Sequence, residues 1–223
     1  YDVGIAYRSD HAGAEAVADA VRSHGGGAAL IAVDVSDPGA VADMFDAHAA
    51  AFGTPHAVVS NAGIVPPRGR SLIDATVEEI DRVIAVNTLG ALYVAREAGR
   101  RMARSRGGDG GVILTISSIA ARLGSAGEYV DYAASKAAVD TMTLGLGHEL
   151  ARDGVRVVSL RPGTIETGIH AKGGQPDRTA RVGPLVPMGR VGTVEEIAET
   201  ALFLISDAAS YITATAVDVS GGR

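Results

Sequence analysis

Tyr132 and Lys136 are the residues of this chain whose types and spacing most plainly suggest chemistry. Residues four positions apart on a helix lie on one face, about one turn apart. A phenol titrates near pH ~10, so it transfers protons poorly at neutral pH unless a fixed cation lowers its pKa. Such pairs also occur on ordinary exposed helices. With a suitable environment, the pair predicts an acid–base site in which Lys136 lowers the pKa of Tyr132.

Polar side chains follow three apolar runs upstream of this pair, which supplies that environment. They are Ser117 and Ser118 after residues 111–116, Asn87 after residues 84–86, and Asn61 after residues 57–60. Ligand sites of parallel sheets lie at the carboxyl ends of the strands. The order of these residues therefore predicts one site at that edge of a parallel sheet.

These residues, in this order, resemble the short-chain dehydrogenase/reductase family over nearly the whole chain. The matching motifs are Asp34-Val35, Asn61-Ala62-Gly63, Asn87, Ser118, Tyr132-x-x-x-Lys136 and Arg161-Pro162-Gly163. The resemblance implies an α/β fold with a doubly wound Rossmann-type parallel sheet, in a single dinucleotide-binding and catalytic domain over residues 1–223. It also implies hydride transfer between a nicotinamide cofactor and a small ketone or secondary alcohol.

Four catalytic roles follow from the resemblance. Tyr132 would move the proton, Lys136 would also hold the nicotinamide ribose, and Ser118 would orient the substrate oxygen. Asn87 would anchor a proton relay to solvent, although an Asn satisfied by a local turn is the alternative. Ser117 competes with Ser118, and the spacing to Tyr132 favours Ser118.

The cofactor contacts implied by the resemblance fall into two groups. At the adenosine end the family pattern points to Asp34, Val35, Asn61, Ala62 and Gly63. At the nicotinamide end it points to Pro162, Gly163, Ile165 and Thr167, together with Tyr132 and Lys136. Small residues in such motifs allow close approach of the backbone to the ligand.

Arg8 and Ser9 favour NADP over NAD, with NAD kept as the alternative. An NAD-selective enzyme usually has an acidic residue at the end of the second strand, where it accepts from the ribose 2′-hydroxyl. Here Tyr7 stands in that place and Arg8 follows. A guanidinium matches the 2′-phosphate of NADP. The alternative is that Arg8 is a solvated arginine at a strand end with no role in binding.

The elements that position these residues alternate between β-like apolar runs and helical patterns, which is typical of βαβ units. Strands are expected near Val3–Tyr7, Ala28–Val33, Ala57–Val59, Val112–Ile116, Val155–Leu160 and Ala216–Val219. Helices are expected near Ala12–His24, Pro38–Phe52, Val77–Arg104, Glu128–Arg152 and Val194–Ile205. Residues about 164–192 break the alternation, and the resemblance implies that they form a substrate lid.

Composition excludes several classes of function. A net charge of −6 gives no reason to expect a nucleic-acid partner or an anionic membrane. The chain has no cysteine, its six histidines show no metal-binding spacing, and no apolar run reaches the ~18 residues of a membrane span. We expect no metal ion. We expect a cytoplasmic location. Small-apolar stretches on the helices near 77–104 and 128–152, with residues 217–222, predict a homotetramer by analogy with the family.

One family hallmark is absent: the glycine-rich turn Thr-Gly-x-x-x-Gly-x-Gly does not occur in the 223 residues. Residues 1–7 match the family's second strand, so we expect the first βα unit, roughly 25–30 residues, to be missing. We then expect a gap at the sheet centre or a rearranged N-terminal half, and weak or no NADP binding by this exact chain. The same absence favours the alternative function of a non-catalytic binding or scaffold protein on this fold.

Overall fold

The computed structural model describes residues 1–66, 70–168, 174 and 176–223. All the strands in this part of the chain pair in parallel. They are β1 (Val3–Tyr7), β2 (Ala28–Ala32), β3 (Ala57–Ser60), β4 (Gly111–Ile116), β5 (Val155–Pro162) and β6 (Thr215–Val219). The strands expected from the sequence are therefore all present, with end points that differ by at most two residues.

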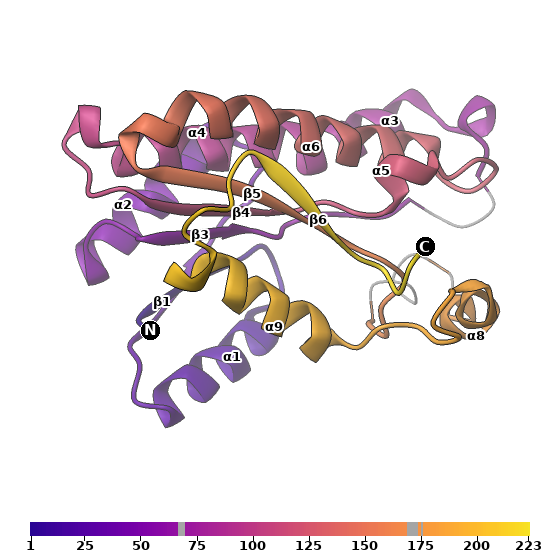
Figure 1. Cartoon of the computed structure of the whole chain (residues 1–223), viewed down its shortest axis with the longest axis horizontal. Helices are drawn as coiled ribbons and strands as arrows, with labels where there is room; N and C mark the ends of the chain where they lie inside the picture. Colours follow the sequence, from indigo (N-terminus) through magenta and orange to yellow (C-terminus); the bar gives the residue numbers. More distant parts are fainter. Residues whose placement is uncertain (67–69, 169–173, 175) are drawn as a thin grey trace.

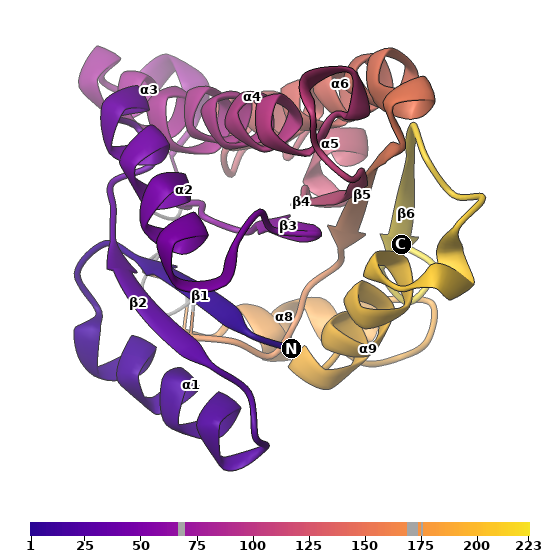
Figure 2. The ribbon, with the colours of Figure 1, turned by 90° about the vertical axis from the view of Figure 1, so that its left-hand side faces the viewer.

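The helices connect successive strands and cover both faces of the sheet. They are α1 (His11–Ser23), α2 (Pro38–Phe52), α3 (Val77–Ile84), α4 (Gly90–Met102), α5 (Ala120–Leu123), α6 (Val130–Leu150), α8 (Arg178–Val182) and α9 (Val194–Ile205). Helices α2, α4 and α6 lie on one face, and α1 and α9 lie on the other (Figure 1). Figure 2 shows the same two layers from the side. The doubly wound α/β class predicted from the sequence is confirmed.

Helix starts follow local capping chemistry. Asp37 caps α2 by accepting from the backbone of Gly39 and Ala40, and Pro38 stands at the first helical position. Thr193 and Glu196 form a capping box at the start of α9. These contacts satisfy backbone N–H groups that a helix N-terminus would otherwise leave unpaired.

The expected helix over residues 77–104 is corrected by the structure. Helices α3 and α4 are separate α-helices joined by a π-helical segment, Ala85–Leu89, in one continuous rod that ends at Met102. Asn87 lies at the middle of the π-helical segment. A π-helical turn inserts where the regular ladder is disturbed, and such turns occur frequently at functional sites.

Two apolar cores hold the layers on the sheet. The core under α2 and α4 contains Val33, Val41, Phe45, Val94, Ala98, Met102, Ile113, Val155 and Val157. The core under α9 contains Leu114, Val158, Leu160 and Leu204. Because successive strand residues face opposite sides, β4 and β5 contribute to both cores and read as continuous apolar runs.

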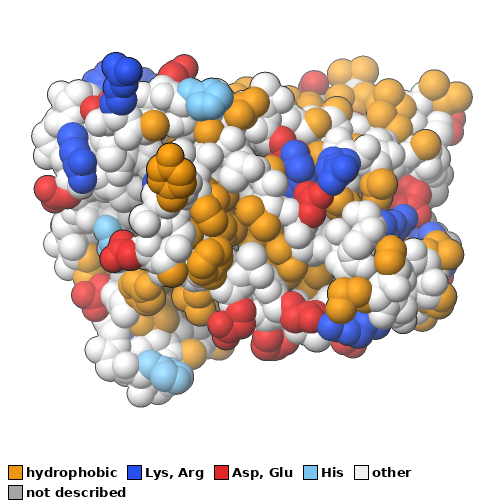
Figure 3. Space-filling model, in the orientation of Figure 1, with side chains coloured by type: hydrophobic (Ala, Val, Ile, Leu, Met, Phe, Trp, Pro, Cys, Tyr) orange, Lys and Arg blue, Asp and Glu red, His pale blue; other side chains and the backbone are white. Residues whose placement is uncertain are grey.

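The sheet is divided into two parts, which confirms the expected interruption. Strands β1 and β2 form one part, and β3, β4, β5 and β6 form the other in that order. Residues of both β1 and β3 line one cavity of about 740 Å³, to which α9 contributes Leu202 and Ile205. In the view of Figure 3, hydrophobic side chains gather near the middle of the molecule, in the region where Figure 1 shows α9. The strand pairing is therefore not continuous between β1 and β3 in the described residues.

Candidate active site

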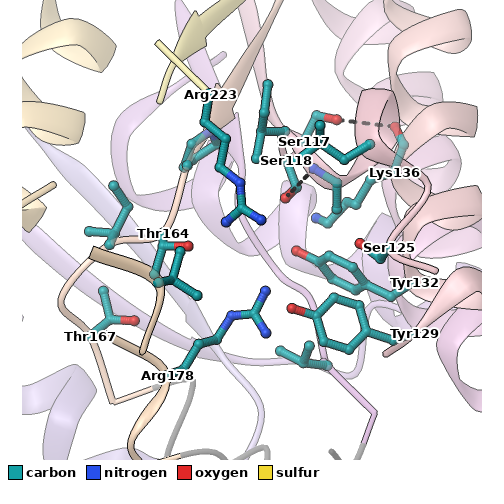
Figure 4. A pocket seen from close by; sticks show the side chains of 18 of the residues that line it. Ser117, Ser118, Ser125, Tyr129, Tyr132, Lys136, Thr164, Thr167, Arg178 and Arg223 are labelled. Carbon is teal, nitrogen blue, oxygen red and sulfur yellow. Dashed lines mark hydrogen bonds between the residues drawn. The ribbon is translucent and has the colours of Figure 1, made fainter. Parts of the chain in front are cut away.

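A cavity of about 760 Å³ opens beside the carboxyl ends of β4 and β5. Ser118 enters its wall from the turn after β4, and Tyr132 and Lys136 enter from the first turns of α6. Pro162 at the end of β5 and Gly163 after it line the cavity, and α8 contributes Arg178, Arg181 and Val182. Figure 4 shows these side chains converging on one space. Ser118, Tyr132 and Lys136 thus share one cavity at this edge of the sheet.

Ser118 and Ser117 have different surroundings, although they are neighbours. The Ser117 hydroxyl is buried and donates to the backbone carbonyl of Lys136, 3.1 Å away. The Ser118 hydroxyl lies in the cavity and accepts from the backbone N–H of Ala120. Ser117 therefore ties β4 to α6, whereas Ser118 is the hydroxyl that a ligand could reach.

Tyr132 lies at the inner end of the cavity, and its ring meets the Tyr129 ring edge-to-face at 5.4 Å between centroids. Burial raises the pKa of Tyr132, and a hydrogen bond with Ser118 opposes this rise. The expected lowering by Lys136 is wrong for this structure. The Lys136 Nζ atom lies 5.8 Å from the centre of the Tyr132 ring and donates to the carbonyl of Ile116 at 2.7 Å.

Lys136 is a buried cation. Its side chain is enclosed between α6 and the end of β4, and burial lowers its pKa to about 8, against a smaller opposing effect of Asp140. The Gly63 backbone approaches closely: a Cβ atom there would lie 3.4 Å from both Lys136 Nζ and Asn87 Oδ1. The turn after β3, the π-helical segment and α6 therefore meet at this lysine.

Asn87 does not line the cavity; it lies behind it and joins three elements. Its Oδ1 accepts from the backbone N–H of Ile64 at 2.8 Å, and its Nδ2 donates to the Ile64 carbonyl at 3.0 Å. The same Nδ2 donates to the Ser135 hydroxyl at 3.1 Å. The side-chain amide is thus satisfied by long-range contacts and not by the local turn considered as the alternative.

The residues expected to bind the cofactor fall into two adjoining cavities. The cavity between β1 and β3 is lined by Arg8, Ser9, Asp34, Val35, Asn61, Ala62 and Gly63. The cavity at Tyr132 is lined by Asn61, Gly63, Tyr132, Lys136, Pro162, Gly163, Ile165 and Thr167. Asn61 and Gly63 belong to both, so every expected contact residue lies along one path from the adenosine end to the nicotinamide end.

Two polar side chains along this path bear on the expected cofactor contacts. The Thr167 hydroxyl oxygen is buried without a hydrogen-bond partner among the described residues, at the position expected to meet the carboxamide or pyrophosphate. A buried hydroxyl without a partner costs free energy, which a ligand acceptor or donor would recover. The Asp34 carboxylate is held by the Ser36 hydroxyl and N–H, which with Arg82 lower its pKa.

Several residues of the cavity were not found from the sequence. Glu128 and Tyr129 precede α6, Arg178 and Arg181 belong to α8, and Arg223 reaches in from beyond β6. Arg178 donates to Glu128 at 2.6 Å and lies over the Tyr129 ring. No local pattern marks them, because they meet only through the fold. Residues 169–173 and 175 of the expected lid lie outside the described residues.

Within the described ranges, no group of three or more His, Cys, Asp and Glu is arranged to hold a metal ion. None of the helices described is both long enough and apolar enough to cross a membrane.

Comparison with known proteins shows the family to which the chain belongs. The family model described as enoyl-(acyl carrier protein) reductase matches residues 1–223. YgfF of Escherichia coli, described as an uncharacterized oxidoreductase, is 44% identical over the whole chain and 90% of its own length. A 3beta-hydroxysteroid dehydrogenase of Eggerthella lenta is 39% identical over 97% of this chain and 81% of its own.

Solved structures agree. A short-chain type dehydrogenase/reductase from Mycobacterium marinum superimposes with a TM-score of 0.91 at 34% identity, covering 99% of this chain and 85% of that one. A 7 alpha-hydroxysteroid dehydrogenase in complex with NADH and 7-oxo glycochenodeoxycholic acid has a TM-score of 0.89 at 28% identity, covering 99% and 84%. The chain belongs to the short-chain dehydrogenase/reductase family of oxidoreductases, whose members bind NAD or NADP and act on small molecules.

Proposed function

We propose that the protein transfers hydride between NADP(H) and a ketone or secondary alcohol, with Tyr132 as the acid–base group. One observation carries the proposal: Tyr132 and Ser118 open into the same cavity, with Lys136 buried one turn behind Tyr132. A carbonyl oxygen between these two hydroxyls would be polarised by both. The fold supplies that space at the carboxyl ends of the strands, where ligands of such sheets bind.

The protein's own groups divide the remaining work. The nicotinamide, when bound, supplies or accepts the hydride. Tyr132 donates its proton to the oxygen in reduction, and Ser118 holds that oxygen in line. Because burial raises the pKa of Tyr132, the phenol is protonated at neutral pH and ready to act as the acid. Lys136 would bind the nicotinamide ribose, and Asn87 would keep the turn after β3 against α6.

The preference for NADP is supported by Arg8, which is exposed on the wall of the cavity between β1 and β3. Arg8 directly follows β1, and Ser9 and Asp34 line the same cavity. A bidentate guanidinium matches a phosphate monoester, which NADP carries and NAD lacks.

The test replaces Tyr132 by Phe, which keeps the ring and removes only the proton-transferring hydroxyl. We expect kcat for a reduced ketone to fall on the order of 10²–10⁴-fold with NADPH affinity nearly unchanged. Tyr211→Phe is the matched control, because Tyr211 is fully exposed and does not line the cavity. Retention of more than half of the wild-type kcat by Tyr132→Phe would defeat the assignment.

A titration followed by nicotinamide fluorescence precedes the kinetics. For an oxidoreductase we expect saturable enhancement of NADPH fluorescence, at the weak affinity that the divided sheet predicts for this chain. A protein that binds no nicotinamide nucleotide and reduces no ketone would instead support the scaffold function considered from the sequence.

A further inference from the structure

The cavity at Tyr132 carries positive charge in a chain that is acidic as a whole. Its described lining residues include the cations Lys136, Arg178, Arg181 and Arg223 but a single acidic residue, Glu128. The net charge of the chain is −6. Residues 67–69, 169–173 and 175, which the structure does not describe, contain no Asp or Glu in the sequence. The charge of the cavity therefore opposes that of the whole protein.

Glu128 is shared between two of these cations and does not balance the set. Arg178 Nη1 donates to its Oε2 at 2.6 Å, and Arg181 Nη1 donates to its Oε1 at 3.2 Å. Burial alone would raise the pKa of Glu128, but the two arginines hold it below its usual value. One carboxylate thus faces two guanidiniums, and Arg223 adds a third guanidinium to the same cavity.

The arginines lie within reach of a substrate held at Tyr132. Arg178 is 9% exposed, and its Cζ atom lies 5.1 Å from the centre of the Tyr129 ring. The Tyr129 and Tyr132 ring centres are 5.4 Å apart, so these two distances end to end put Arg178 no more than about 10.5 Å from the Tyr132 ring. Figure 4 shows Arg178 and Arg223 entering from opposite sides and pointing toward the space in front of both rings.

Many of the other side chains that line the cavity are apolar. They include Leu123, Val182, Leu185, Val194 and Ile197. An apolar wall with a few convergent polar groups is typical of a small-molecule site and fixes the orientation of an amphipathic ligand. A guanidinium on such a wall binds an anionic oxygen pair through paired N–H donors.

We propose that the substrate is an amphipathic carbonyl compound with an anionic group, which Arg178 and Arg223 bind while the carbonyl lies at Tyr132 and Ser118. The inference rests on the proposed function for the position of the carbonyl. The anion is a carboxylate or a phosphate on a short apolar body. Glu128 holds Arg178 and Arg181 in place and weakens their attraction for the anion.

The rival interpretation is that Arg178, Arg181 and Glu128 only fasten α8 to the start of α6. In that case the arginines would serve the entrance as a whole and would not distinguish charged from neutral substrates. Glu128→Gln separates the two interpretations. Removing the carboxylate strengthens anion binding if the arginines recognise the substrate, whereas it weakens binding of every substrate if the contact only fastens the helix.

Binding is measured first, without cofactor, by ligand-observed NMR titration. The probes are 4-acetylbenzoate, 4-acetylphenyl phosphate and the neutral 4-acetylbenzamide, which share a ketone on a rigid ring. They are titrated into the wild type, Arg178→Met, Glu128→Gln and the control Arg152→Met, an exposed arginine outside both cavities. NADPH-dependent reduction of the same three ketones is then followed by the loss of nicotinamide absorbance.

For the wild type and the control we expect the better of the two anions to bind at least about ten-fold more tightly than the amide. Arg178→Met removes this preference and leaves amide binding unchanged, and Glu128→Gln increases it. The affinities of 4-acetylbenzoate and 4-acetylphenyl phosphate show whether the cavity prefers a carboxylate or a phosphate. Equal wild-type affinity for all three probes, or equal losses for all three in Arg178→Met, would overturn the inference.

The two proposals fail in different ways. Selective anion binding that depends on Arg178, with no reduction of any ketone, would reject the proposed function and keep the anion site. Reduction of the amide as efficient as that of both anions would keep the proposed function and reject the anion site.

Discussion

At the scale of a single residue, Lys136 is buried and yet has to carry a positive charge for the proposed chemistry. Its ammonium group is buried behind Tyr132, and burial lowers its pKa to about 8. Nevertheless, the proposed chemistry needs a cation at that point to bind the ribose. The Ile116 carbonyl, 2.7 Å from Nζ, partly replaces the water that the ammonium loses.

The first prediction concerns the pH dependence of stability. An unfolded lysine titrates near ~10.4, so between pH ~8 and ~10.4 the unfolded chain holds a proton that folded Lys136 has released. The free energy of unfolding should therefore rise with pH in this window through Lys136. Relative to Lys136→Met, the wild type should gain up to about 2 kcal/mol between pH ~8 and ~9.5 in urea titrations.

Above this window, a buried tyrosine makes the free energy of unfolding fall as pH rises. Burial raises the pKa of Tyr129 to about 12, so its unfolded form ionises first and stability falls as pH rises past ~10. A flat difference between wild type and Lys136→Met from pH ~8 to ~9.5 would contradict the buried-cation description.

The second prediction concerns Arg8 and the choice of cofactor. Arg8→Ala should weaken NADPH binding far more than NADH binding, by roughly 1.5–3 kcal/mol, because only NADPH offers a 2′-phosphate. Dissociation constants from nicotinamide fluorescence measure the difference. Arg22→Ala, on the exposed face of α1, is the control. Equal losses for the two nucleotides would mean that Arg8 does not bind the phosphate.

Sequence patterns predicted which residues share the site, but they did not predict the direction in which the pKa of Tyr132 is shifted. Ser118, Tyr132 and Lys136 share one cavity, as expected, because strand ends and helix spacing are local properties. The direction of the Tyr132 pKa shift was wrong, because it depends on how deeply the ring is buried and on where the lysine ammonium points. Neither quantity is encoded in spacing.

At the scale of elements, α6 brings the site together. Its first turns carry Tyr132 and Lys136, while Asp131, between Tyr129 and Tyr132, is buried against Arg70. Arg70 Nε and Nη1 have no hydrogen-bond partner in the part of the chain that the structure describes, and Glu79 Oε2 lies 3.6 Å from Nε. This buried ion pair fixes the start of the helix immediately before the proposed catalytic residue.

The third prediction tests this ion pair. Asp131→Ala leaves the buried Arg70 charge without its main partner and should reduce the free energy of unfolding by about 3–5 kcal/mol. The double variant Asp131→Ala with Arg70→Met should lose less, because no unpaired charge remains. Urea denaturation measures both, and an equal loss in the two variants would show that the charge pair is not the cause.

The sequence predicted the order and type of the elements because apolar runs and capping residues mark them locally. It did not predict the break of the long helix into α3, the π-helical segment and α4. That break depends on the contacts of Asn87 with Ile64 and Ser135, which are distant in the chain. The same reason explains why Arg178 and Arg223 were missed, since they join the site only through the fold.

At the scale of the whole molecule, the helical layer presents apolar side chains to solvent. Leu92 on α4 and Leu144 on α6 are 41% and 49% exposed, and Leu89 in the π-helical segment is 38% exposed. Exposed apolar residues on neighbouring helices mark a contact surface more often than scattered single residues do.

The fourth prediction is that the protein forms a homotetramer in which α4 and α6 make one of the interfaces. Light scattering at micromolar concentration should give the mass of four chains. Leu92→Glu with Leu144→Glu should reduce that mass, because burying these carboxylates at an interface is costly. Thr200→Glu, on α9, is the control. A monomeric wild type would refute the assembly.

The division of the sheet also affects cooperativity. Strands β1 and β2 with α1 form a small unit that pairs with no other strand in the described residues, and two strands alone are marginally stable in water. This unit carries Arg8 and Ser9, whereas Tyr132 and Lys136 belong to the four-stranded part. A dinucleotide along the proposed path would bridge the two, so its binding free energy would be coupled to the local unfolding equilibrium of the smaller unit.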